Sequence, residues 1–302
     1  MLELVLFVAL ITVLGLLVGS FLNVVIYRVP MMLFADWRNE CREFIAQEQK
    51  EAEASSQDSA FGKSGSDIKA EKEVFNIAVP RSHCPVCKSQ VKAWQNIPIV
   101  SYILLGGKCA SCKTPISLRY PIIELITGLL SAFIAYTFGA SYLTGLALLL
   151  TWALICLTMI DVDHQLLPDN ITLPLLWLGL IANYFSAFTD LPSAVLGAIV
   201  GYMILWSIYW AFKLLTGKEG MGFGDFKLLA ALGAWMGWHM LPTIIILSSL
   251  VGAVVGIAGI AIMGKDKNKP IPFGPYLAAA GWIAFFWGEQ INQAYLSFSN
   301  IA

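Results

Sequence analysis

The chain has 302 residues, of which 58% are hydrophobic and only 13% carry a charge, and its mean hydropathy is +0.71. A soluble globular domain is about 45–50% apolar and about 25% charged. The composition therefore excludes an ordinary soluble protein and predicts an all-α polytopic membrane protein in contact with a lipid bilayer. The net charge is −1, and we expect no nucleic-acid partner.

Apolar runs separated by short breaks predict about eight transmembrane helices. The first, residues 1–27, lacks a basic segment ahead of it and is too long for the apolar part of a signal peptide, so we expect a retained helix. The other expected spans are 121–138, 143–160, 171–188, 192–212, 226–240, 242–263 and 277–296. Each is close to the roughly 20 residues that cross the hydrocarbon, although 226–240 is short. The boundary between 226–240 and 242–263, at Trp238, His239 and Pro242, has the weakest support in the sequence.

The basic residues predict the orientation of these helices. Of the 19 Lys and Arg, 13 lie in the first connection, 28–119. The remaining six, in the fifth and seventh connections, are Lys213, Lys218, Lys227, Lys265, Lys267 and Lys269. Both chain ends and the connections near 139–142, 189–191 and 238–241 carry none. Because basic loops stay inside, the odd-numbered connections are expected in the cytoplasm and both termini in the periplasm.

The first connection, 28–119, is long enough to form a small cytoplasmic domain between the first two helices. Its early part, 31–79, is rich in Glu, Ser, Gln and Lys, which predicts a solvated helix and then a flexible stretch around 55–66. Its later part, 81–119, is dense in Cys, Pro and Gly and predicts a compact fold. We expect the remaining residues, 120–302, to form a seven-helix membrane domain.

Two Cys-x-x-Cys pairs predict a zinc-binding loop in this cytoplasmic domain. Cys84 and Cys87 are followed, after 21 residues, by Cys109 and Cys112. Each pair can present two thiolates to one tetrahedral Zn²⁺. The reducing cytoplasm disfavours two structural disulfides. A redox role for one pair is an alternative, but the βαβ context of such motifs is missing. Closed Cys₄ sites are normally structural, so the ion is expected to fold the loop and not to activate water.

Two acids at the ends of apolar segments are the candidate catalytic pair. Asp161 directly follows the run 143–160, and Asp225 follows a Gly-x-Gly sequence and leads into another apolar run. Both lie in odd-numbered connections, so both are expected at the cytoplasmic face. Acids at such positions are costly and are usually functional or paired. Two carboxyl groups that share one proton can hydrolyse a peptide bond, one as base and the other as acid.

Ordinary roles are the alternative for acids at a membrane boundary. Asp163 fits a solvated residue, and Asp169 with Asn170 fits the N-cap of the segment 171–188. A transporter or channel with a cytoplasmic zinc domain is a further alternative, because intramembrane acids also relay protons. Transporters usually place polar groups near the midplane between repeats, whereas this sequence places them at one face.

Several motifs together resemble one family, the type IV prepilin leader peptidases, also called prepilin N-methyltransferases. They are residues 19–28 (GSFLNVVIYR), the four cysteines, residues 117–124 (SLRYPIIE), Asp161 with Leu167-Pro168-Asp169, and the Gly-x-Gly-Asp that ends at Asp225. The stretch 31–79 departs from the family pattern, and we expect it to be a variable region without a catalytic part.

The resemblance implies a bifunctional enzyme of the bacterial inner membrane. Such enzymes cut the basic leader from type IV prepilins and type II secretion pseudopilins after a glycine. They then methylate the new N-terminal residue, usually Phe, with S-adenosylmethionine. The resemblance assigns catalysis to Asp161 and Asp225, as in GxGD-type aspartyl proteases, and associates methylation with the cysteine loop and with Gly107 beside Lys108. It leaves the role of Glu124 open. A leader peptidase with purely structural zinc is the alternative.

Overall fold

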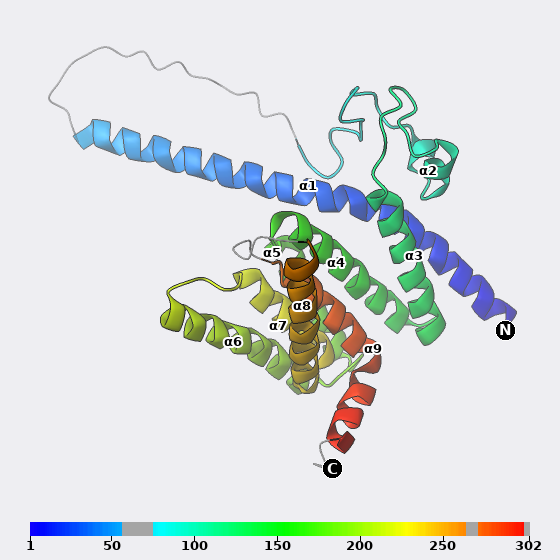
Figure 1. Ribbon diagram of the computed structural model, residues 1–302, viewed down its shortest axis with the longest axis vertical. Coiled ribbons are helices and arrows are strands. Elements are labelled where there is room, and N and C mark those ends of the chain that lie inside the picture. Colours follow the sequence, from blue (N-terminus) through cyan, green and yellow to red (C-terminus); the bar gives the residue numbers. More distant parts are fainter. Residues whose placement is uncertain (56–74, 264–270, 299–302) are drawn as a thin grey trace.

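The computed structural model describes residues 1–55, 75–263 and 271–298, which form an all-helical protein with a cysteine loop between its first two long helices (Figure 1). The helices are α1 (Leu2–Ser55), α2 (Val100–Leu104), α3 (Arg119–Phe138), α4 (Tyr142–His164), α5 (Asp169–Tyr184), α6 (Leu191–Thr216), α7 (Phe223–Met236), α8 (Leu241–Met263) and α9 (Gly274–Phe298). Two 3₁₀ turns, Ala93–Asn96 and Trp238–Met240, complete the order. The predicted fold class is confirmed.

Five helices among the described residues are long and apolar enough to cross a membrane, namely α1, α3, α4, α6 and α8. The chain is therefore a multi-pass membrane protein. The expected count of about eight is not confirmed. Helix α5 has 16 residues and α7 has 14, so they extend only about 24 Å and 21 Å at 1.5 Å per residue. Helix α9 matches the last expected segment but is not among the five.

Helix α1 is much longer than the expected first span. It runs from Leu2 to Ser55, so the expected boundary between 1–27 and 28–119 falls inside a helix. Figure 1 shows its second half projecting past the helix bundle, and residues 41–49 are exposed, as expected for a solvated helix. The flexible stretch expected at 55–66 lies, apart from its first residue, outside the described residues.

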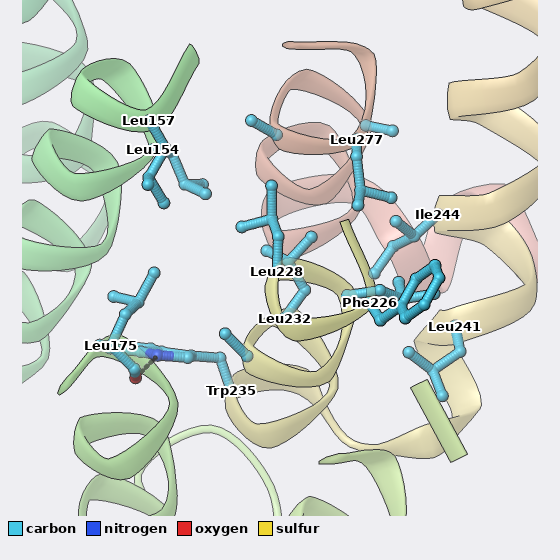
Figure 2. Close-up of a cluster of buried hydrophobic side chains, with 14 of the residues drawn as sticks. Leu154, Leu157, Leu175, Phe226, Leu228, Leu232, Trp235, Leu241, Ile244 and Leu277 are labelled. Carbon is cyan, nitrogen blue, oxygen red and sulfur yellow. Dashed lines mark hydrogen bonds between the residues drawn. The ribbon is translucent and has the colours of Figure 1, made fainter. Parts of the chain in front are cut away.

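Helix α7 forms the centre of the membrane bundle. Every residue from 225 to 236 except the half-buried Lys227 is buried, and the helix contacts α5, α6, α8 and α9. Figure 2 shows its apolar side chains among those of α4, α5, α8 and α9; the labelled residues are Leu154, Leu157, Leu175, Phe226, Leu228, Leu232, Trp235, Leu241, Ile244 and Leu277. A helix that is apolar all round belongs in a core. On one side its backbone touches that of α6 where Gly197 meets Gly233, because a Cβ on either glycine would overlap the other's carbonyl.

Polar contacts fix the far end of α7. Trp235 Nε1 donates to Leu175 O at 2.9 Å. The Asn183 side-chain amide donates to the carbonyls of Ala234 and Trp235, at 2.8 and 3.0 Å, and so satisfies the end of the helix. Gly237, at φ +82°, then turns the chain into the 3₁₀ turn before α8. The predicted break between 226–240 and 242–263 is therefore present, and both ends of α7 have defined positions.

Candidate functional site

Asp161 and Asp225 line a single open cavity of about 390 Å³. Asp161 lies in the last turn of α4 and Asp225 in the first turn of α7. Both side chains are nearly buried, with 5% and 7% of their residue surfaces exposed. Their sequence separation is 64 positions, yet the fold brings both predicted acids to the same cavity. The remaining lining comes from α1, the α4–α5 connection and the residues around Gly222.

Close backbone approach explains the second glycine of the Gly-x-Gly sequence before Asp225. A Cβ on Gly224 would lie 2.7 Å from Leu167 Cβ, so only glycine lets the start of α7 pack against the α4–α5 connection. That connection begins where Gln165, at φ +53°, ends α4 in the left-handed region. The tight contact at Leu167 therefore fixes the spacing between the ends of α4 and α7 that carry the two acids.

The backbone of Gly274 is a site component that sequence reasoning missed. Its N–H donates to Asp161 Oδ2 at 3.0 Å. This N–H is available because α9 begins at Gly274, and the first N–H groups of a helix have no partner within the helix. A Cβ at this position would lie 2.6 Å from the same oxygen. The available signal was a glycine between Pro272-Phe273 and Pro275, directly before the last apolar run.

The other boundary acids form ion pairs, of which the one at Asp169 lines the cavity. Asp163 pairs with Arg119 at 2.6 Å and so joins α4 to the start of α3. Asp169 accepts from Lys227 Nζ through both oxygens at 2.7 Å and joins α5 to α7. The predicted cap role of Asp169 is wrong: Pro168 occupies the cap position, and no side-chain cap bond forms there. Asp163 is likewise paired and not simply solvated.

The four predicted cysteine ligands meet in the loop between α1 and α3. Their sulfur atoms all lie within 4.8 Å of one another. Cys84 Sγ is 3.8 Å from Cys112 Sγ, and Cys87 Sγ is 4.0 Å from Cys109 Sγ. A tetrahedral ion with Zn–S bonds of about 2.3 Å requires sulfur pairs about 3.8 Å apart, whereas a disulfide requires about 2.05 Å. The donor set and its spacing therefore fit Zn²⁺.

The two cysteine pairs are copies of one backbone unit. In the first, Cys84 N–H donates to Ser89 O and Lys88 N–H to Cys84 O; in the second, Cys109 N–H donates to Thr114 O and Lys113 N–H to Cys109 O. Lys88 and Lys113 have nearly equal φ values, +58° and +62°. The sequences CPVCKS and CASCKT carry this short repeat. Each unit therefore presents its two sulfurs in the same way.

Hydroxyl groups next to the cysteines favour the thiolate form that binds metal. Ser89 Oγ lies 3.0 Å from Cys87 Sγ, and its hydrogen bond lowers the pKa of the Cys87 thiol. Thr114 Oγ1 lies 3.1 Å from Cys112 Sγ and lowers the pKa of that thiol in the same way. Hydrogen bonds to the charged form of a group favour that form, so these hydroxyls support metal binding from outside the ligand shell.

Glu124 attaches the cysteine loop to the membrane helices. Its carboxylate is buried in α3 and accepts the Ile99 N–H at 2.8 Å. Ile99 has φ +60°, which is rare for a β-branched residue, and it directly precedes α2. Gly107 follows α2, at φ +66°, with no open space beside it: a Cβ there would lie 2.7 Å from Tyr102 Oη. Ile99 and Gly107 therefore both set the path of the chain toward the second cysteine pair.

Comparisons with known proteins agree on one family across most of the chain. Residues 13–138 match the bacterial peptidase A24 N-terminal domain, and residues 148–257 match the type IV leader peptidase family. The four cysteines lie in the first match and both cavity acids in the second. No solved structure matches the chain.

Curated relatives are similar over almost their whole length. A prepilin leader peptidase/N-methyltransferase of Stutzerimonas stutzeri is 54% identical over 96% of this chain and 93% of its own. The protein of that name from Pseudomonas aeruginosa is 52% identical over 95% and 92%. The one from Neisseria gonorrhoeae is 50% identical over 95% and 93%.

The zinc site predicts a simple outcome for metal content. Cys109→Ser should remove zinc from the purified protein, because a serine hydroxyl does not replace a thiolate ligand. Metal content can be measured by plasma mass spectrometry after gel filtration in detergent. Cys41→Ser is the matched control, because Cys41 is an exposed free thiol on α1 away from the cluster, and it should keep its zinc. Undiminished zinc in Cys109→Ser would contradict the assignment.

Proposed function

This chain belongs to the type IV leader peptidase family, and on that premise we propose that it cuts the basic leader from type IV prepilins and type II secretion pseudopilins after a glycine. The observation that carries the proposal is the pair of nearly buried carboxyl groups, Asp161 and Asp225, on one open cavity. We assign these two residues as the catalytic pair. The similar proteins are named as prepilin leader peptidases and N-methyltransferases, and both activities are proposed for this chain.

The two carboxyl groups divide the acid and base work of hydrolysis. Like charges held near each other cannot both ionise easily, so the pair shares one proton. The ionised carboxylate takes a proton from water as the water oxygen attacks the peptide carbonyl. The protonated carboxyl gives its proton to the carbonyl oxygen. Collapse of the tetrahedral intermediate then breaks the C–N bond: the carboxyl that received the water proton gives it to the departing amine, and a hydroxyl of the intermediate returns its proton to the other carboxylate as the carbonyl re-forms. The Gly274 N–H orients Asp161 throughout.

The position of the cavity suits a prepilin substrate. Such a substrate has a basic leader in solution joined to an apolar helix in the membrane, so its scissile bond lies at the boundary. Asp161 ends α4, which is long and apolar enough to span the bilayer. The basic residues of the connections support a cytoplasmic location for this end of α4. We therefore propose a protein of the bacterial inner membrane with periplasmic termini and a cytoplasmic active site.

We propose methyl transfer to the new N-terminal amine as the second activity. S-adenosylmethionine would supply the methyl group, and the free amine of the cleaved product would accept it. Zn²⁺ on Cys84, Cys87, Cys109 and Cys112 would shape the loop that this activity uses. Gly107 would act through the turn it supports, because Tyr102 fills the space beside it, while Lys108 offers an exposed cation next to that turn.

Either catalytic substitution should stop leader removal. Asp161→Asn and Asp225→Asn should each lower the cleavage rate by at least about 10⁴-fold, because the acid–base pair works as a unit. The assay incubates purified enzyme with a prepilin and reads the product by mass spectrometry. Asp190→Asn is the matched control: Asp190 caps α6 through Ser193 N–H, and Asn caps as well. Cleavage at the wild-type rate by either catalytic variant would refute the assignment.

Gly274→Ala tests the backbone contact to Asp161. The added methyl would lie 2.6 Å from Asp161 Oδ2 and must displace that carboxylate or the start of α9. We expect a roughly 100-fold loss of cleavage, the scale that a displacement of about 1 Å can produce. Gly145→Ala serves as the control, because a Cβ at Gly145 of α4 meets nothing within 4 Å. Full activity in Gly274→Ala would show that the contact does not matter.

The same assay separates the two proposed activities. Wild-type enzyme with S-adenosylmethionine should yield a product heavier by one methyl group than the product formed without it. Cys84→Ser should still cleave but should release unmethylated product, since the loop loses its metal while the aspartates lie elsewhere. An unmethylated product from wild-type enzyme with donor present would overturn the methyltransferase proposal and leave a peptidase with structural zinc.

A further inference from the structure

Asp161 lies in the last turn of α4, where the helix by itself gives little support. The backbone hydrogen bond that closes this turn runs from Gln165 N–H to Asp161 O at 2.9 Å, and Gln165, at φ +53°, then ends the helix. Helix ends fray because part of their backbone has no partner within the helix. The position of the Asp161 carboxyl therefore depends on contacts that other elements make with this turn.

An arginine of α3 contacts this turn on both sides of Asp161. Arg119 Nη1 donates to Asp163 Oδ1 at 2.7 Å, Nη2 lies 2.6 Å from Oδ2, and Nη2 makes a longer contact of 3.5 Å with Met159 O. Residues four apart share one face of a helix, and the residue midway between them points away from that face. Arg119 therefore supports the outer face of α4, while Asp161 on the other face receives the Gly274 N–H.

The two charges of this pair are placed to join helix ends. Arg119 is the first residue of α3, and Asp163 is in the last turn of α4. A cation at a helix start and an anion at a helix end each oppose the dipole of their own helix, whereas each is attracted by the dipole of the other helix. The bidentate geometry adds a fixed direction to the charge. The pair therefore stabilises these two helix ends only while they lie together.

Arg119 is itself anchored to α1. Helix α3 packs along α1, and Asn23 Nδ2 of α1 donates to Tyr120 O in the first turn of α3 at 3.2 Å. Asn23 belongs to the segment 19–28, and Arg119 and Tyr120 belong to the segment 117–124, the two segments near helix starts and ends that carry the family resemblance. The α1–α3 pair thus presents the guanidinium to the end of α4.

We propose that Arg119 is a positioning residue for peptide cleavage: through Asp163 it holds the last turn of α4, so that the Asp161 carboxyl keeps its place on the cavity it shares with Asp225. This inference rests on the proposed leader peptidase activity. Neither Arg119 nor Asp163 lines the cavity, so the pair acts through the helix and not on the substrate. Arg119 lies in the part of the chain that matches the N-terminal domain family, whereas both cavity acids lie in the peptidase match. Cleavage therefore depends on an arginine from outside the peptidase match.

Steady-state cleavage of a prepilin by the full-length enzyme in detergent tests this role. Asp163→Asn and Arg119→Gln should each lower kcat roughly 10- to 100-fold, the scale that a displacement of up to about 1 Å can produce. KM should stay nearly unchanged, because the substrate does not meet the pair. The double variant should lose no more than either single variant, since all three lack the same interaction. Arg119→Lys should keep more activity than Arg119→Gln, because it retains the charge without the bidentate geometry.

Arg42→Gln is the matched control, because Arg42 is an exposed arginine on the projecting half of α1 and does not line the cavity. It should leave kcat and KM unchanged. Gel filtration and zinc content report whether each variant is folded, and Asp163→Asn, which keeps the size of the side chain, carries the test if Arg119→Gln does not fold.

Three outcomes would overturn the inference: a wild-type kcat in Asp163→Asn, a loss confined to KM, or losses that multiply in the double variant. In each of these cases the wild type still cleaves the prepilin. A wild type that does not cleave it would instead overturn the proposed function.

Discussion

The burial of α7, complete from 225 to 236 apart from the half-buried Lys227, is the constraint on which the membrane half depends. Helix α7 is too short to cross the hydrocarbon alone, so it is stable only inside a shell of other helices. The glycine contact at Gly197 and Gly233 brings α6 against it, and Asn183 completes the hydrogen bonding at its far end. Since packed interiors resist displacement, Asp225 at the other end has little freedom to move.

The cavity forms where three other segments meet the start of α7: the end of α4, the α4–α5 connection and the start of α9. Helix α4 ends just after Asp161, the α4–α5 connection packs on Gly224, and α9 begins at Gly274. Helix termini carry the backbone groups that helices themselves leave unpaired. A site assembled from termini therefore gains hydrogen-bond donors without using side chains, and the contact from Gly274 N–H to Asp161 is an example. Two ion pairs add links between helices: Asp163 with Arg119 joins α4 to α3, and Asp169 with Lys227 joins α5 to α7.

The sequence predicted the parts of the site that depend on residue type and local spacing. Asp161 and Asp225 stood out because acids next to apolar runs are costly, and the cysteines because their spacing is that of metal ligands. The sequence could not predict the hydrogen bond from Gly274 N–H to Asp161. A backbone donor has no residue-type signal, and only two neighbouring prolines distinguish this position. Sequence reasoning also missed two residues of α1 that line the cavity, Leu33 and Trp37, because polar residues after 27 suggested an end to the first helix, whereas α1 continues to Ser55. The expected helix count is not confirmed for a related reason, since hydropathy does not distinguish a buried short helix such as α7 from a membrane span.

The paired cysteine units have a topological consequence. Each cysteine pair supplies only two of the four ligands, so a metal ion bound to both pairs links Cys87 to Cys109. The chain between them, which includes Ile99 and α2, then forms a closed loop. Closing a loop removes chain entropy chiefly from the unfolded state. Two interactions order the residues of this closed loop. One is the metal ion bound by the four cysteines, and the other is the hydrogen bond from Ile99 N–H to the Glu124 carboxylate. Loss of the metal would leave this segment joined to the membrane helices by hydrogen bonds such as Ile99 N–H to the Glu124 carboxylate and Ser20 Oγ to Asn96 O.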